Sequence, residues 1–285
     1  MKMKLKKRII AFVLSCVTLM NIISLPVQAA TTVRETEPNN TRETAMTITA
    51  NRETPAQAVS GSKPNQYVVD GYTSSGDDDW FMVYLDAGTQ YLTLNGDSYF
   101  NYEVYSESGS TPIIRGQYVK TGFGSTAYNF TAATAGYYYV RLYTNLSSIL
   151  DYSMLVGDPV YTVASCTVEL GDVTISGSDR NVSANLVWEA DIPEDAIVYA
   201  MTVNNVRSTA VSGISVRNRT TNNTINLNSY TWSKSGLVSL SMPVRSNWQI
   251  TFEYSKNITL TPTITFQFVY PVTSEYLEDD ITIIL

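Results

Sequence analysis

Two short segments of the sequence concentrate carboxylate and amide side chains. Residues 35–40 read Glu-Thr-Glu-Pro-Asn-Asn, and residues 77–79 read Asp-Asp-Asp. Since proline disfavours helix at the residue before it, the chain preceding Pro38 should be extended, which points Glu35 and Glu37 to the same side. Carboxylates gathered without a basic partner repel one another unless a cation lies between them. The first segment therefore has the chemistry of half a cation site.

Calcium suits these side chains better than other metal ions. It takes about six to eight oxygen ligands, accepts carboxylates and carbonyls together, and tolerates irregular geometry. Asn39 continues the side of the two glutamates, and Asn40 offers another amide oxygen. Asp77 and Asp79 could share a face and complete the site, with Asp78 turned to solvent. Zinc fits poorly, because the sequence has no histidine. The alternative is a solvated acidic turn and a Pro-Asn-Asn turn that only reverses the chain.

The start of the chain has the features of a secretory leader. A basic beginning is followed by an apolar run from Ile9 to about Leu25, and Ala29-Ala30 suits a signal peptidase. We therefore predict a signal peptide over residues 1–30 and a mature chain that is secreted, or held at the cell surface by other means. An uncleaved anchor is the alternative, because the apolar run approaches spanning length. We expect no membrane span after leader cleavage.

Charge narrows the range of partners. The sequence has 19 basic and 26 acidic residues, a formal net charge of −7, and a group of its basic residues lies between Lys2 and Arg8. Loss of the leader makes the remaining chain more acidic still. Nucleic acids and anionic membrane surfaces are bound through basic patches, so we exclude both as partners.

Short alternating strands dominate the rest of the sequence. Residues 248–254 and 264–270 carry apolar side chains at every second position, which is typical of antiparallel sheets with one solvated face. Residues 80–85 are apolar on both faces, which predicts a central strand. Turn residues separate the runs, as in β-sandwiches. We predict an all-β chain of two consecutive antiparallel β-sandwich modules after the signal peptide, spanning residues 31–158 and residues 159–285.

Five motifs follow one another in the first module. They are Glu35-Thr-Glu-Pro-Asn-Asn40 with Ala45, Asp77-Asp-Asp-Trp-Phe81, Leu85-Asp-Ala-Gly88, Ala135-Gly-Tyr-Tyr-Tyr-Val-Arg141 and Asp151-Tyr-Ser-Met-Leu-Val156. In this order and spacing they make residues 33–157 resemble the bacterial pre-peptidase C-terminal domain family. These are small β-sandwiches usually appended to secreted peptidases, and they include the collagen-binding domains of clostridial collagenases.

The resemblance implies a metal site but no reaction. In calcium-binding relatives, acids of the first motif and acids before the aromatic strand form the site. Catalysis in those proteins belongs to a different domain, and residues 159–285 carry no motif of a family that we recognise. The calcium ligands that the resemblance implies here are Glu35, Glu37, Asn39, Asn40, Asp77 and Asp79.

A stripe of tyrosines with one arginine is the candidate binding surface. Tyr137, Tyr139, Arg141 and Tyr143 alternate with apolar residues along one predicted strand. If this stripe is exposed, its rigid rings and its guanidinium could anchor an extracellular protein or polysaccharide. The alternative is that the tyrosines flank the core of the sandwich, because tyrosine favours strands.

The sequence contains no convincing catalytic constellation. Histidine, a G-x-S-x-G elbow and a Gly-rich phosphate loop are all missing. Acidic clusters at residues 189–195 and 275–280 lie in turn-like segments, where a charged surface is expected rather than a carboxylate pair for glycoside hydrolysis. We therefore expect a secreted, non-catalytic binding, adhesion or accessory protein. The alternative is a secreted enzyme, or an accessory of a protease or glycosidase, with its activity in residues 159–285.

Overall fold

The computed structural model describes residues 28–96, 98–120, 124–175, 180–186, 192–227 and 230–273. Strands make up most of this chain, which confirms the predicted all-β class. Most of the predicted leader, the acidic residues at 275–280, and Glu189 and Asp191 lie outside the described residues. Among the described residues, no helix is long and apolar enough to cross a membrane.

The chain divides into two compact units, which we call the first and the second unit. Of the described residues, the first unit comprises 28–161 with 271–273, and the second comprises 162–270. The first unit contains both acidic segments and the tyrosine stripe, so it is the unit in which the predicted sites lie.

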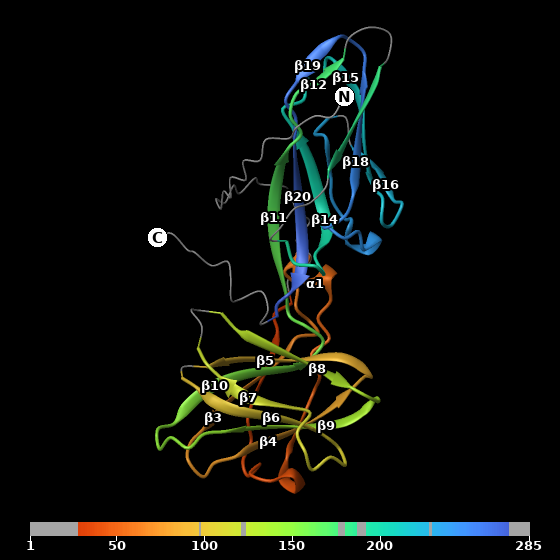
Figure 1. Cartoon of the computed structure of the whole chain (residues 1–285). Coiled ribbons are helices and arrows are strands. Elements are labelled where there is room, and N and C mark those ends of the chain that lie inside the picture. Colours follow the sequence, from red (N-terminus) through yellow and green to blue (C-terminus); the bar gives the residue numbers. More distant parts are fainter. Residues whose placement is uncertain are drawn as a thin grey trace. The chain divides into compact units, whose positions relative to one another are not determined.

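The first unit is a β-sandwich of two five-stranded sheets. Sheet A has the strand order β1-β3-β10-β5-β8, and sheet B has the order β2-β4-β9-β6-β7. The two layers are visible in Figure 1. The elements are β1 (Thr31–Arg34), η1 (Arg42–Thr44), β2 (Met46–Ile48), α1 (Pro55–Ser60), β3 (Tyr67–Thr73), β4 (Asp79–Leu85), β5 (Gly88–Gly96), β6 (Phe100–Ser106), β7 (Ile114–Tyr118), β8 (Thr126–Ala132), β9 (Gly136–Tyr143) and β10 (Leu150–Gly157).

Alternation along the strands builds the core between these sheets. In β4, Phe81, Val83 and Leu85 are fully buried, whereas Trp80 is partly exposed and Tyr84 is exposed. Burial of each large apolar side chain stabilises the sandwich by about 1.5–3 kcal/mol. The strand lies inside sheet B, as its apolar sequence predicts, and its two faces differ in burial. Its outward positions carry amphipathic aromatic residues, which tolerate partial exposure.

Each of the first two strands runs parallel to the strand that it pairs with, and the alternation pattern does not predict this. β1 pairs with β3 in sheet A, and β2 pairs with β4 in sheet B. The chain between them, residues 35–45, therefore passes from one sheet to the other, and we call it the crossover segment. Two backbone bonds attach it: Glu35 N donates to Asp70 O at 2.8 Å, and Trp80 N donates to Asn39 O at 2.9 Å. The crossover segment thus carries the first acidic motif to the start of β4.

The second unit is built from β11 (Tyr161–Glu169) onward. Its sheets have the orders β11-β20-β14-β17, β13-β18-β15-β16 and β12-β19. Trp248, Ile250 and Phe252 of β18 and Phe266 of β20 are fully buried, as the alternation predicts. The remaining elements are β12 (Val173–Ile175), β13 (Asn181–Leu186), β14 (Ile197–Asn204), β15 (Val211–Asn218), β16 (Thr224–Asn226), β17 (Ser233–Lys234), η2 (Val238–Leu240), β18 (Trp248–Tyr254), β19 (Ile258–Leu260) and β20 (Thr263–Pro271).

Candidate metal centre

Three carboxylates from two separate segments meet where the crossover segment reaches β4. One oxygen each of Glu35, Glu37 and Asp79 lies within 4.8 Å of the other two. Glu35 follows the last residue of β1, Glu37 lies in the crossover segment, and Asp79 begins β4. The fold thus brings together carboxylates that are more than forty positions apart in the sequence.

Glu35 is the most firmly held of the three. Its Oε2 accepts a hydrogen bond from Tyr72 N at 3.0 Å. Its Oε1 accepts bonds from Asn39 Nδ2 at 2.8 Å and from the Tyr152 hydroxyl at 2.9 Å. Gly71 makes room for this arrangement, because a Cβ at that position would collide with both the Glu35 carboxylate and the Tyr152 hydroxyl. The carboxylate is therefore fixed by sheet A on one side and by the crossover segment on the other.

Asn39 connects the two glutamates. Its backbone N donates to Glu37 Oε2 at 2.9 Å, and its side-chain amide donates to Glu35. The side chain is fully buried, and its Oδ1 accepts no hydrogen bond from any described residue. A buried amide oxygen without a donor costs about 1–3 kcal/mol, so this atom is a candidate ligand for a cation.

Asp79 is the least solvated acid of the group. Its side chain is 0% exposed, and neither oxygen accepts a hydrogen bond of normal geometry from the described part of the chain. Burial, and after it the nearby charge of Glu35, raise the pKa of Asp79 to about 10. A carboxylate buried without a partner is costly, and either a proton or a cation must neutralise it.

The other two predicted ligands, Asp77 and Asn40, lie outside the group of three carboxylates. Asp77 is partly exposed and is not one of the three converging acids, although burial and then the charge of Glu35 raise its pKa. Asn40 is exposed, and its neighbour Asn39 is the amide that points to the carboxylates. Asp78 is partly exposed, but it is also engaged by an ion pair that the sequence did not predict: both Nε and Nη2 of Arg141 donate to its Oδ2.

These residues fit a hard cation such as calcium. Oxygens of Glu35, Glu37 and Asp79 face one another, and the unpaired Oδ1 of Asn39 belongs to the same cluster of contacts. Calcium accepts mixed carboxylate and amide oxygens and also takes water at open positions. Glu37 is exposed, so solvent reaches one side of the group. Nothing in this set favours a softer metal, since nitrogen and sulfur ligands do not take part.

The predicted tyrosine stripe lies on the outer face of sheet B. Tyr137 is 41% exposed, and Tyr139, Arg141 and Tyr143 are partly exposed, while the residues between them point into the core. Arg141 forms a second ion pair, to Glu103 at 3.0 Å, and its guanidinium lies 4.1 Å from the centre of the Tyr143 ring. The arginine is therefore already engaged by side chains of its own sheet.

Sequence reasoning missed the residues that complete this face. The guanidinium of Arg42 lies over three rings, those of Trp80 at 5.4 Å, Tyr105 at 4.3 Å and Tyr139 at 5.3 Å. Trp80 and Tyr105 stack at 5.6 Å. Arg42 opens the short helix η1 in the crossover segment, so this contact attaches that segment to sheet B. Only the cross-strand register of β4, β9 and β6 reveals the cluster.

Comparison with known proteins gives weak likenesses only. No family profile and no curated protein matches the sequence. Among solved structures, the pre-peptidase C-terminal domain of collagenase from Bacillus anthracis is 16% identical and covers 43% of this chain and 99% of its own, with a TM-score of 0.30. PliG from Aeromonas hydrophila, a periplasmic inhibitor of g-type lysozyme, is 14% identical and covers 39% and 98%, with a TM-score of 0.26. The candidate metal centre is therefore supported only by the geometry of its own residues.

Proposed function

We propose that the first unit is a calcium-stabilised, non-catalytic module of a secreted binding or accessory protein. The observation that carries this proposal is Asp79, which is fully buried beside two other carboxylates and has both oxygens unpaired among the described residues. An ion bound there would be held by Glu35, Glu37, Asp79 and the amide oxygen of Asn39. It would supply the positive charge that these side chains lack.

The expected role of the ion is structural. The crossover segment joins sheet A to sheet B, and its carboxylates of Glu35 and Glu37 lie close to that of Asp79 in β4, which they repel when all three are charged. A cation that binds the folded state alone stabilises it by about 2.7 kcal/mol when its free concentration is 100 times the dissociation constant. The fold of the first unit would then depend on external calcium, as suits a secreted protein.

A non-catalytic role agrees with the chemistry of the centre. Glu35 and Glu37 accept hydrogen bonds from backbone amides, and Glu35 also accepts them from Asn39 and the buried Tyr152. The sequence offers no histidine to work with these acids. The outer face of sheet B is the proposed contact surface for an extracellular protein or polysaccharide. It combines the exposed Tyr84 and Tyr137, which meet edge to face at 5.4 Å, with the rings around Arg42 and Arg141.

Thermal unfolding in calcium and in chelator tests the metal proposal. The melting temperature of the wild type should rise by several degrees in calcium. The Asp79→Asn variant should melt no lower than the calcium-free wild type, since a buried amide needs neither a proton nor a cation to neutralise it. Calcium should not change the melting temperature of this variant. Glu107→Gln, a matched change of an exposed acid in the same unit, should respond as the wild type does. Equal melting of the wild type in both solutions would show that a proton neutralises Asp79.

Sedimentation with insoluble polymers tests the contact surface. Collagen, cellulose, chitin and peptidoglycan are each incubated with the wild type and with a Tyr84→Ala/Tyr137→Ala variant. Retention by one polymer that the double variant loses would support the surface. Retention that is equal for both proteins, or absent for all four polymers, would refute it.

A further inference from the structure

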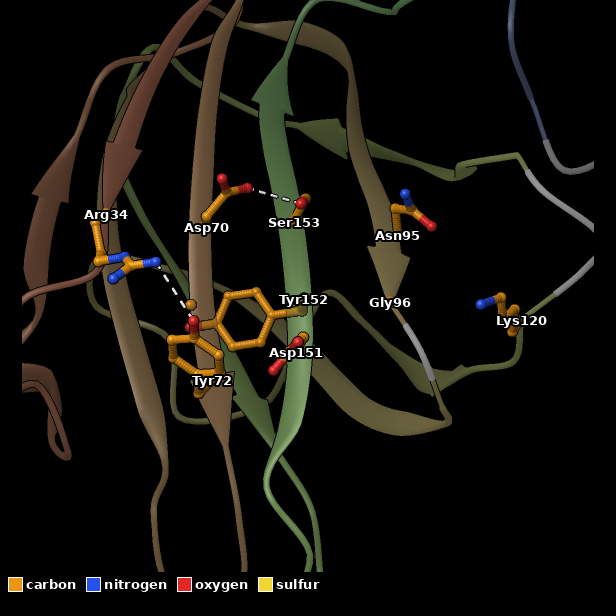
Figure 2. Close-up of a pocket in the computed structure, with 10 residues that line it drawn as sticks. Arg34, Asp70, Tyr72, Asn95, Gly96, Lys120, Asp151, Tyr152 and Ser153 are labelled. Carbon is orange, nitrogen blue, oxygen red and sulfur yellow. Dashed lines mark hydrogen bonds between the residues drawn. The ribbon is translucent and has the colours of Figure 1, made fainter.

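A second site lies on the opposite sheet, away from the tyrosine stripe. The outer face of sheet A contains a groove with a volume of about 360 Å³. Figure 2 shows that its lining side chains come from β1, β3, β10 and β5, with Lys120 following β7 at the far side. A volume of this size is at the lower end of the range for small-molecule sites.

Strand register arranges the polar groups of the groove in a row. Arg34 is paired with Asp70, Asp70 with Ser153, and Ser153 with Asn95, so four neighbouring strands each contribute one side chain at the same level. Neighbouring strands are about 4.8 Å apart, which makes the row about 14 Å long. The row is therefore long enough to follow an extended ligand across the sheet.

An aromatic ring lies beside this row. Tyr72 is 43% exposed, and it is paired across the strands with Asp151. Arg34 lies with its guanidinium 5.7 Å from the centre of the Tyr72 ring and donates to the Tyr72 hydroxyl at 3.4 Å. Arg34 thus orients the ring of Tyr72, and part of the ring surface stays open to solvent.

The polar groups are held in position and differ in hydrogen-bonding character. Ser153 Oγ donates to Asp70 Oδ1 at 2.7 Å, which fixes that carboxylate and leaves its second oxygen as an acceptor. Asn95 offers both a donor and an acceptor, and the exposed Asp151 offers two acceptors. The groove can therefore accept and donate hydrogen bonds over its whole length.

The charges of the described side chains that line the groove balance. Arg34 and Lys120 lie at its two sides, and Asp70 and Asp151 lie between them, as Figure 2 shows. Two cations and two anions give no net attraction for a polyanion or for a basic peptide. A neutral ligand with many hydroxyl groups meets both donors and acceptors without carrying a charge into the groove. The apolar C–H face of such a ligand can pack on the ring of Tyr72, because a tyrosine ring offers an apolar surface beside its polar hydroxyl.

We propose that this groove binds a short neutral stretch of a polysaccharide. The sugar rings lie across β3, β10 and β5, with one ring on Tyr72 and the hydroxyls bonded to Asp70, Asn95 and Asp151. This site is separate from the outer face of sheet B, and the inference does not depend on calcium at the metal centre.

A nitrogen–proton correlation NMR titration of the full chain with soluble tetrasaccharides tests the proposal. The neutral probes are cellotetraose, chitotetraose, maltotetraose and xylotetraose. Two comparison ligands are glycine, which is a zwitterion, and a heparin tetrasaccharide, which is a polyanion. At least one neutral tetrasaccharide should shift the backbone amide signals of Tyr72, Asn95 and Asp151. Affinities near 1 mM are sufficient for this measurement.

Two variants and one control locate the binding. Tyr72→Ala and Asn95→Ala, both at exposed positions, should each weaken binding by about three- to tenfold. Glu107→Ala, at an exposed position outside this groove and outside the outer face of sheet B, should leave it unchanged. The proposal is overturned if none of the four neutral sugars shifts these amides, if glycine or the heparin fragment shifts them more strongly, or if both groove variants bind as the wild type does.

Discussion

The Tyr152 hydroxyl donates a hydrogen bond to Glu35 Oε1 over 2.9 Å. Tyr152 belongs to β10, and the side chains on either side of it, Asp151 and Ser153, line the groove of sheet A. Glu35 belongs to the group of three carboxylates at the crossover segment. One tyrosine of β10 therefore connects the candidate metal centre with the strand that forms the floor of the groove in sheet A.

Removing this hydroxyl should destabilise the first unit. Tyr152→Phe keeps the ring, which packs against Phe81 and Phe100, but removes one hydrogen-bond donor from Oε1 of the partly buried Glu35. Loss of a hydrogen bond to a charged group costs about 1.5–3 kcal/mol. Urea unfolding, followed at the indole signal of Trp80 so that the first unit is observed alone, measures the change. Tyr137→Phe, on the solvated face of sheet B, is the control, and equal stability of both variants would contradict the prediction.

Gly71 should not tolerate even a methyl group. A Cβ at this position would collide with the Glu35 carboxylate and the Tyr152 hydroxyl, so Gly71→Ala should displace Glu35 and lower both stability and calcium affinity. We expect a loss of about 1–3 kcal/mol, as for overpacking elsewhere. Gly136→Ala is the matched control, because its Cβ would meet no described atom within 4 Å. A wild-type calcium response in Gly71→Ala would show that the glycine does not shape the centre.

Arg42 should hold the crossover segment on sheet B. Its guanidinium contacts three rings, and a partly desolvated cation–π contact contributes about 0.5–2 kcal/mol. We expect Arg42→Ala to lower the free energy of unfolding by about 1–2 kcal/mol and to weaken calcium binding, since the same segment carries Glu35 and Glu37. Arg115→Ala, at an exposed arginine of β7, serves as the control in the same urea experiment. The role of Arg42 is refuted if both variants unfold at the same urea concentration.

Glu53 should make the first unit less stable as the pH rises. Its side chain is 2% exposed, and burial raises its pKa, against the opposing effects of the hydrogen bond from Tyr161 N and the charge of Lys63. A carboxyl whose pKa is higher in the folded state binds its proton more tightly there. Its contribution to stability is therefore fully present below the unfolded pKa and is lost as the pH rises through the folded pKa.

Glu53→Gln removes this titration and keeps an acceptor oxygen for Tyr161 N and Gln66 Nε2. Between pH 4.5 and 7, the stability difference between the wild type and this variant should shift in favour of the variant as the pH rises. Unfolding in urea at several pH values, again followed at Trp80, measures the difference. A constant difference across this range would show that Glu53 does not titrate there.

The sequence predicts local structure better than it predicts partners. The strands around Trp248 and Phe266 follow directly from period-two alternation, because one face of each strand is buried. Glu35 and Asp79 were found as candidate ligands, since carboxylates without basic neighbours are conspicuous. The ion pair of Asp78 was missed because its partner Arg141 is 63 positions away and is brought to it only by the pairing of β4 with β9.

The remaining features depend on register between strands. Arg42 is an ordinary charged residue in the sequence, and its position over Trp80 and Tyr105 follows from how β2 joins β4 in parallel. The groove of sheet A has no sequence motif, because its row of polar residues takes one residue from each of four strands. Alternation indicates which face a residue occupies but not its neighbours on the next strand.

Calorimetric titration of calcium into the chelator-treated full chain tests the central claim most directly. Binding of a single ion by the wild type and by Glu107→Gln, with no binding by Asp79→Asn, is the result that the metal centre predicts. Absence of binding by the wild type, or equal binding by Asp79→Asn, would contradict it.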